Sequence, residues 1–291
     1  MEETPFKRFV SDFCASRLAL AGAVALLAVL FIAMFAPWIS PQNPYDLSQL
    51  DVLDARLAPG EKLGNGKTAI LGTDDQGRDM LSAIFYGLRI SLAVGVSATV
   101  IALFIGTVVG MLAAYAGGRT DGLLMRVADI QLSFPPILIA LVLLALLGQG
   151  TGKIIVALIT VQWAYYARTV RGAALVERRR EYIEAAQVLA LPVSRIIFRH
   201  LLPNCLPPLI IIAAVQVASA ITLEATLSFL GLGLPITEPS LGLLIANGFN
   251  YMLSGKYWIS LFPGVALLIT VVAINLVADQ LRDVLNPRLQ R

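Results

Sequence analysis

Residues 90–116 read ISLAVGVSATVIALFIGTVVGMLAAYA, and none of these side chains carries a charge. A helix needs about 20 predominantly apolar residues to cross the hydrocarbon core of a bilayer, so this stretch is long enough to span one. The whole chain has the same character, with 57% of its 291 residues hydrophobic, 14% charged and a mean hydropathy of +0.78. Soluble domains carry roughly a quarter charged residues. The excess apolar surface predicts an all-α, polytopic membrane protein whose helices face lipid.

Six uncharged or nearly uncharged stretches are long enough to cross the membrane. They lie at about 18–39, 90–116, 126–147, 152–170, 206–232 and 258–278. The first is too long for the roughly 7–15 apolar residues of a signal peptide, so we interpret it as a retained span. In the fourth, only Ile154 to Ala167 is free of charge, and the side chain of Arg168 is long enough to reach the interface. These stretches predict a bundle of six transmembrane helices.

Six spans place both ends of the chain on one side of the membrane. Cytoplasmic loops carry an excess of Lys and Arg, and a cytoplasmic N-terminus puts 15 of the 22 Lys and Arg residues on cytoplasmic segments. We therefore expect both termini in the cytoplasm. The predicted layout is a cytoplasmic N-terminus at 1–17, a first transmembrane helix at 18–39, an external loop at 40–88, a five-helix core at 89–280 with a cytoplasmic loop at 171–204, and a cytoplasmic tail at 281–291.

The scarcity of reactive side chains excludes several kinds of site. The chain has one His and two distant cysteines, Cys14 and Cys205, so neither a disulfide framework nor a zinc site is supported. No Walker A, His-Glu-x-x-His or Gly-x-Ser-x-Gly motif is present. The net charge of +3, without a basic stripe interleaved with aromatic residues, argues against nucleic acid as a partner. We expect no metal, no cofactor and no catalytic residue on this chain.

The cytoplasmic loop predicts two short helices that meet at an angle. The stretch from Arg178 to Ala190 is rich in helix-forming residues, and Pro192 ends it. Ser194 can cap a second short helix, and Pro203 marks the entry into the fifth span. Such a helical knob suits contact with a partner protein, whereas its positive charge suits lipid headgroups. The residues alone leave these two interpretations open.

The loop holds Glu184-Ala185-Ala186, a small residue at position 190, and then Arg199 and the pair Leu202-Pro203. This spacing resembles the EAA motif of ABC importer permeases. In that family the loop forms a coupling helix, which docks in a groove of a cytoplasmic ATP-binding subunit. The resemblance implies that coupling to an ATPase involves Glu184, Ala185, Ala186, Ala190, Arg199 and Pro203. The motif has Gly where this chain has Ala190, and the extra methyl group removes the easiest route to a positive φ at the bend.

Three other segments narrow the resemblance to the dipeptide/oligopeptide/nickel group, and within it to the second permease subunit. They are the external segment at 72–91, the end of the fifth span at 227–233, and the tail at 279–288. Together with the loop they cover the chain from about residue 70 to its end. Leu241 departs from the group, which commonly has Trp there, so the substrate stays open among peptides, nickel chelates, opines and glycosides.

The resemblance implies a type I ABC importer permease fold in the bacterial inner membrane. It implies a permease subunit that moves peptides or similar small solutes, with ATP and Mg bound by other subunits. The implied partners are a second homologous permease subunit, two ATP-binding subunits, an extracytoplasmic solute-binding protein and membrane lipid.

Glu224 is a charged residue inside the fifth predicted span. A carboxylate within a membrane is costly, so it is by default a candidate functional residue. It is suited to line the translocation pathway and bind the amino end of a peptide, or to pair with a partner subunit. The alternative is a carboxyl group that hydrogen-bonds to Thr222 or Thr226.

The external segment carries a cluster of charges at Asp74, Asp75, Arg78 and Asp79. We predict contacts with the solute-binding protein or the sister permease. The alternative is an ordered turn in which Arg78 and Asp79 pair locally.

The remaining expectations concern helix packing and the functional class of the protein. Asp129 is expected to pair with Arg126 at i, i+3, and Gly106 with Gly110 predicts close helix packing. A membrane enzyme acting on lipid or cell-wall intermediates is the alternative function, but its one candidate cluster, residues 178–180, lacks a general base. A stand-alone secondary transporter would favour inverted repeats, and no convincing second half is present.

Overall fold

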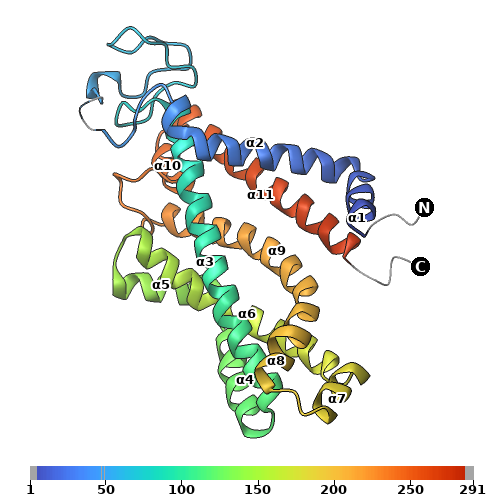
Figure 1. Ribbon diagram of the computed structural model, residues 1–291. Helices are drawn as coiled ribbons and strands as arrows, with labels where there is room; N and C mark the ends of the chain where they lie inside the picture. The colour runs from blue at the N-terminus through green and yellow to red at the C-terminus, as the bar shows by residue number, and fades with distance from the viewer. Residues whose placement is uncertain (1–4, 47, 49, 286–291) are drawn as a thin grey trace.

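The computed structural model describes residues 5–46, 48 and 50–285, and within these ranges the chain is all-helical, with two isolated bridges in place of strands (Figure 1). The longer helices are α1 (Pro5–Cys14), α2 (Arg17–Ile39), α3 (Met80–Ala116), α4 (Gly118–Ser133), α5 (Pro136–Leu147), α6 (Thr151–Glu177), α7 (Glu181–Val188), α9 (Leu202–Phe229), α10 (Leu241–Phe249) and α11 (Trp258–Val284). The short turns are η2 (Val52–Asp54), α8 (Val193–Arg195), η3 (Ile196–Leu201) and η4 (Met252–Ser254). The ends of the predicted terminal segments, 1–4 and 286–291, lie outside the described residues.

Four helical segments are long and apolar enough to cross a membrane, namely α2, α3, the continuous run Val193–Phe229 and α11. A fifth crossing results if α4 and α5 together count as one span. α6 has 27 residues, about 40 Å of helix, but Lys153, Arg168 and Arg171 reduce its apolar character. The prediction of an all-helical, multi-pass membrane protein is confirmed.

α4 and α5 meet at 91°, so the stretch predicted as a single span at 126–147 is broken. The backbone is extended at Phe134 and Pro135, whose ψ angles are 143° and 127°. Pro135 and Pro136 explain the break, because proline lacks an N–H and disfavours helical angles in the residue before it. α5 has 12 residues, about 18 Å of helix, which is shorter than the roughly 30 Å hydrocarbon core. α5 therefore does not cross the membrane by itself.

α3 is the central helix of the fold, with 37 residues that pack along α6 and α9 (Figure 1). At Gly106 a Cβ atom would lie 2.5 Å from the Trp163 carbonyl oxygen, and at Gly110 it would lie 2.4 Å from the Ala167 carbonyl oxygen. A side chain does not fit at either position, so the backbones of α3 and α6 touch. The close packing predicted for this pair of glycines is confirmed.

The described residues of 40–79, which belong to the predicted external loop, form a cap at the N-terminal end of α3 (Figure 1), and we call it the external cap after that prediction. Asp79 is the N-cap of the helix, because its Oδ2 accepts hydrogen bonds from the Ser82 N–H at 2.8 Å and from the Ser82 hydroxyl at 2.7 Å. α3 therefore begins at Met80, and residues 80–88 of the predicted loop are helical. The cap also touches α11, since Trp258 Nε1 donates to a cap carbonyl, that of Thr73, at 3.3 Å.

The loop that was predicted to be cytoplasmic departs from the predicted pair of separate short helices. α7 ends at Val188, but the second helix is continuous through α8, η3 and α9, so it is the N-terminal end of a long helix. Pro192 precedes this helix and Ser194 lies inside it, so the cap predicted for Ser194 is wrong. Pro203 lies inside this continuous helix and does not interrupt it, just after η3, where the hydrogen bonding changes from π-helical to α-helical.

Candidate coupling site and translocation face

α7 has two different faces. Ile183 and Ala186 form the inner face, with exposed fractions of 0% and 4%. They pack in one apolar cluster with residues of α3, α6, η3 and α9. Glu184 and Ala185 are exposed on the outer face. Among the residues predicted for the ATPase contact, Ala186 therefore faces the chain's own core, whereas its two neighbours are accessible.

The C-terminal end of α7 exposes apolar side chains. Val188 is 86% exposed and Leu189 is 72% exposed, and Phe198 on η3 is 69% exposed. Arg199 and Pro203 are also exposed, on η3 and at the start of α9. The EAA spacing does not single out Leu189 or Phe198. The sequence nonetheless indicates Leu189 and Phe198, because large apolar residues are unexpected in a basic loop that contacts only solvent.

Ala190 takes the left-handed backbone conformation, with φ of 52°. Only one other non-glycine residue among those described, Arg56, has a positive φ. A left-handed residue with a Cβ atom is strained by roughly 1–2 kcal/mol relative to the right-handed form. The chain therefore makes at Ala190 the bend for which the EAA motif uses Gly, and it carries that strain.

Tyr182 ties α7 to its neighbours. Its hydroxyl donates to Glu177 Oε2 at 2.7 Å and accepts from Asn204 Nδ2 at 3.0 Å. Burial and the Glu177 carboxylate raise the pKa of Tyr182 to about 12, so it stays protonated and keeps donating at neutral pH. The end of α6, the start of α7 and the start of α9 are joined by this one side chain.

Two arginines of α6 are neutralised by acids of α4. Arg171 binds Asp121 through both carboxylate oxygens, at 2.5 Å and 2.6 Å. Arg168 Nη2 lies 3.0 Å from Asp129 Oδ1. The predicted pairing of Asp129 with Arg126 is therefore wrong, because a partner on another helix takes its place.

Glu224 is fully buried, with an exposed fraction of 0%. Its Oε2 accepts from the Ser91 hydroxyl of α3 at 2.9 Å, and its Oε1 accepts from the Ser228 hydroxyl at 2.7 Å. The alternative partners considered from the sequence, Thr222 and Thr226, donate instead to backbone carbonyls of their own helix. In this arrangement the carboxyl group fastens α9 to α3.

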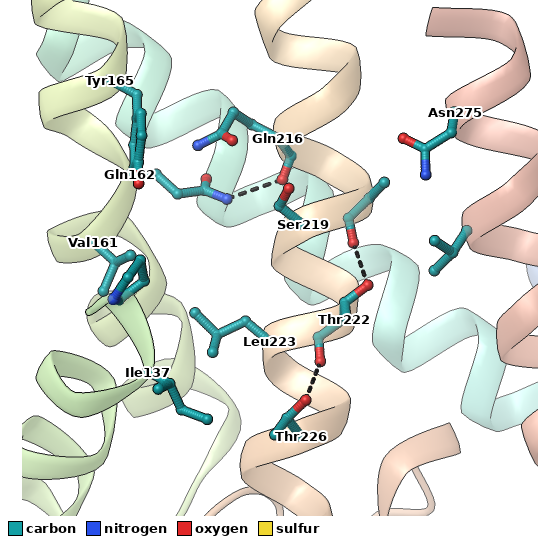
Figure 2. A pocket seen from close by; sticks show the side chains of 13 residues that line it. Ile137, Val161, Gln162, Tyr165, Gln216, Ser219, Thr222, Leu223, Thr226 and Asn275 are labelled. Atoms are coloured by element: carbon teal, nitrogen blue, oxygen red, sulfur yellow. Dashed lines mark hydrogen bonds between the residues drawn. The ribbon is translucent and has the colours of Figure 1, made fainter. Parts of the chain in front are cut away.

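A cavity of about 470 Å³, lined by both apolar and polar side chains, lies on the other side of α9, and Figure 2 shows it from close by. Its polar lining comes from α6, α9 and α11 and consists of Gln162, Tyr165, Gln216, Ser219, Thr222, Thr226 and Asn275. Gln162 is held in place, because its Nε2 donates to the Gln216 carbonyl at 2.9 Å and its Oε1 accepts from Thr99 at 3.2 Å. The lining offers amide and hydroxyl groups and includes no Asp, Glu, Lys, Arg or His, and Glu224 is not part of it.

The external charges lie mostly inside the cap. Arg78 is 1% exposed, and its Nε lies 3.4 Å from Oδ2 of the equally buried Asp74. Arg78 also donates to the Gln76 side chain and, at 3.0 Å, to the Ile236 carbonyl. Burial outweighs the Arg78 charge and raises the pKa of Asp74 to about 6. Arg78 therefore pairs with Asp74 rather than with Asp79, which is the N-cap of α3.

Comparison with known proteins places the chain. A family model described as "Binding-protein-dependent transport system inner membrane component" matches residues 106–291, and one described as "N-terminal TM domain of oligopeptide transport permease C" matches residues 4–59. The dipeptide transport system permease protein DppC of Escherichia coli (strain K12) is 42% identical over 289 residues, which is 99% of this chain and 95% of that protein.

Two further matches agree. The di/tripeptide transport system permease protein DppC of Pseudomonas aeruginosa (strain UCBPP-PA14) is 37% identical over 288 residues, which is 99% of this chain and 93% of that protein. Among solved structures, the MetNI methionine ABC transporter in an inward-facing conformation has a TM-score of 0.59 at 21% identity, over 71% of this chain and 98% of that one. The chain therefore belongs to the binding-protein-dependent transport system inner membrane components, as a multi-pass inner-membrane permease subunit of an ABC importer and not as an enzyme.

Proposed function

We propose that this subunit moves peptides or similar small solutes into the cytoplasm, as one of two pore subunits above a pair of ATP-binding subunits. ATP and Mg bind to that pair, and an extracytoplasmic binding protein delivers the solute. The peptide substrate is supported by relatives that are named dipeptide and di/tripeptide permeases at 42% and 37% identity over nearly the whole chain. The cavity beside α9 fits this cargo, because the amide and hydroxyl groups in its mixed lining can hydrogen-bond to peptide backbone without selecting a side-chain charge.

We infer six crossings with both ends in the cytoplasm, made by α2, α3, the pair α4 and α5, α6, α9 with its α8 extension, and α11. The ion pairs of Arg168 and Arg171 with acids of α4 support α6 as a span, because they neutralise its charges. α1 and the C-terminal part of α11 lie side by side, since Gln280 Nε2 donates to the Asp12 carbonyl at 3.0 Å (Figure 1). The predicted layout is kept as the proposed topology with one change, since the external loop ends at Asp79 and the core begins with α3 at Met80. The coupling loop is proposed at 171–204.

The observation that carries the coupling proposal is the division of α7 into a buried and an exposed face. Its inner face is anchored on the cytoplasmic ends of three long helices, so a push on α7 reaches all three. Its outer face carries Glu184 and Ala185, with Val188 and Leu189 at the tip. We assign these residues, together with Ala190, Arg199 and Pro203, to the contact with the ATP-binding subunit, and Ala186 to the packing beneath it.

We propose that the solute moves along the polar side of α9. A second cavity of about 450 Å³ lies at the end of α9 near the external cap, with Gln149, Asn247 and Asn250 in its lining. It continues the first cavity along the helix, because Ser228 and Phe229 line it where Thr226 lines the other. Glu224 lines neither cavity, although its hydrogen-bond partner Ser228 lines the second one. A pathway role for Glu224 therefore requires its hydrogen bonds to Ser91 and Ser228 to open during transport.

For the external charges we keep the proposal of a partner contact in a restricted form. Asp74, Arg78 and Asp79 are buried, so they shape the external cap, and only the partly exposed Asp75 is accessible to a binding protein or a sister permease.

Leu189→Glu tests the coupling proposal. The importer would be purified with its partners, and retention of the ATP-binding subunit, ATP hydrolysis and peptide uptake would be measured. A carboxylate at an apolar contact should detach the ATP-binding subunit, whereas Leu53→Glu, at an exposed leucine of the external cap, should retain it. Retention of the ATP-binding subunit and full uptake in Leu189→Glu would contradict the proposal that the tip of α7 docks on that subunit.

A further inference from the structure

Arg178 directly follows α6 and lies two residues before Arg180, the N-cap of α7, and it is half-buried. Its Nη1 donates to the Ala114 carbonyl at 2.9 Å and to the Tyr115 carbonyl at 3.0 Å. Its guanidinium carbon lies 5.3 Å from the centre of the Tyr115 ring. Arg179 and Arg180, by contrast, are exposed.

The two carbonyl groups belong to the last turn of α3, which ends at Ala116. The last four carbonyls of a helix lack partners within the helix, and the C-terminal end carries partial negative charge. A guanidinium group satisfies both needs, and the Tyr115 ring beneath it adds a cation–π contact. Arg178 is therefore the C-terminal cap of α3, although it is supplied by the segment that leads into α7.

This contact joins two distant parts of the chain through one rigid element. The 37 residues of α3 extend about 55 Å from Arg178 to the external cap. At the far end, the Met80 N–H donates to the Gly72 carbonyl at 2.9 Å, and Arg78 holds the Ile236 carbonyl at 3.0 Å. A displacement of the base of α7 thus has a direct mechanical route to the external end.

We propose that Arg178 is a positioning residue that transmits the movement of α7 to α3, and so links ATP hydrolysis to opening at the external end. The inference rests on the proposed coupling function of α7. It goes beyond that function because the contacts of Arg178 are with α3 of the same chain. Its role is to hold α7 to α3 inside this chain. The competing explanation is that Arg178 binds anionic lipid headgroups, in which case any of the three successive arginines would serve.

The test compares Arg178→Gln, Arg178→Lys and the matched control Arg179→Gln in proteoliposomes that contain the complete importer and its binding protein. The quantity measured is the amount of peptide transported per ATP hydrolysed. Loss of two charge-assisted hydrogen bonds should lower this ratio about tenfold in Arg178→Gln, with ATP hydrolysis retained. Arg178→Lys should recover part of it, and Arg179→Gln should match the wild type. An unchanged ratio in Arg178→Gln overturns the proposal, as does an equal loss in Arg179→Gln.

Tyr115→Ala covers the case in which Arg178→Gln does not assemble. It removes the ring under the guanidinium group but keeps the backbone carbonyls, so the transport ratio should fall by about threefold. Tyr115→Phe keeps the ring and should behave as the wild type. An unchanged ratio in Tyr115→Ala overturns the proposal. Failure of the proposed function is separate, because the wild-type chain would then purify without ATP-binding subunits or take up peptide without ATP.

Discussion

The external cap and the predicted coupling loop around α7, residues 178–203, which we call the knob, lie at opposite ends of α3, and both carry charged motifs that stand out in the sequence. In the cap, Arg78 and Asp74 are buried and their contacts are internal. In the knob, Glu184 and Ala185 are exposed, and the buried contacts are made by Ile183 and Ala186. Charged motifs of one chain therefore have two physical roles. They hold the chain's own fold where they are buried, and they are available to a partner where they are exposed.

Arg78→Met should have the largest effect on the stability of the cap. A small effect would contradict the view that the buried charges of the cap hold its fold. It leaves the Asp74 carboxylate buried without its cation, and removing one partner of a buried pair typically costs about 3–5 kcal/mol. The free energy of opening the cap, measured by pulse proteolysis in nanodiscs at neutral pH, should fall by that order. Adding Asp74→Asn should recover most of the loss. Glu184→Met in the knob should leave opening of the cap unchanged.

The pH dependence of the cap should be the next largest effect. Asp74 has its pKa raised from 3.8 to about 6, so the folded cap binds a proton more tightly than the opened cap. Its stability should be greatest below pH 3.8, fall as the pH rises through about 6, and then level off. Hydrogen exchange of residues 72–79 across this range measures it. Asp74→Asn should abolish the step, and a step that persists in this variant would assign it to another group.

Asp79→Ala should have a smaller effect, because it removes an N-cap rather than a buried charge pair. Loss of such a cap costs about 0.5–2 kcal/mol, and the Ser82 N–H would lose its partner. Protection of the first turn of α3 against hydrogen exchange reports it, with Asp75→Ala as the control. Equal effects of the two substitutions would contradict the assignment of Asp79 as the cap.

Ala190→Gly should have the smallest effect and the opposite sign. Glycine adopts φ near 52° without strain, so the knob should gain about 1 kcal/mol or less. The matched control is Ala185→Gly, within α7, which should lose up to about 1 kcal/mol. Thermal unfolding of the purified subunit compares the two. Destabilisation by both would mean that the methyl group of Ala190 makes a contact worth more than the strain.

The helical, multi-pass architecture is readable from the sequence because its signal is local, in long uncharged stretches. The spacing from Glu184 to Pro203 is likewise a local signal, and it predicts the coupling loop. The bend between α4 and α5 is also encoded locally, in Pro135 and Pro136, but the continuous apolar composition of 126–147 conceals it.

The contacts that the sequence does not reveal are those between distant segments. The Ile236 carbonyl is the partner of Arg78, and Arg168 replaces Arg126 as the partner of Asp129. Spacing along one helix identifies only Arg126 as a partner for Asp129, whereas the packing of α4 on α6 brings Arg168 to it. Likewise, the chain at Ala190 adopts the positive φ that glycine would make easiest, because α7 and Pro192 fix the direction on either side.

The ion pairs between α4 and α6 have a consequence for how the protein is made. α6 brings Arg168 and Arg171 toward the bilayer, and Asp129 and Asp121, which neutralise them, belong to a helix synthesised earlier. Because bare charges enter lipid poorly, α6 is expected to leave the insertion machinery only after it has met α4. Biogenesis then proceeds in pairs of helices, and a substitution at Asp121 would appear as a defect of membrane integration before it appeared as a defect of transport.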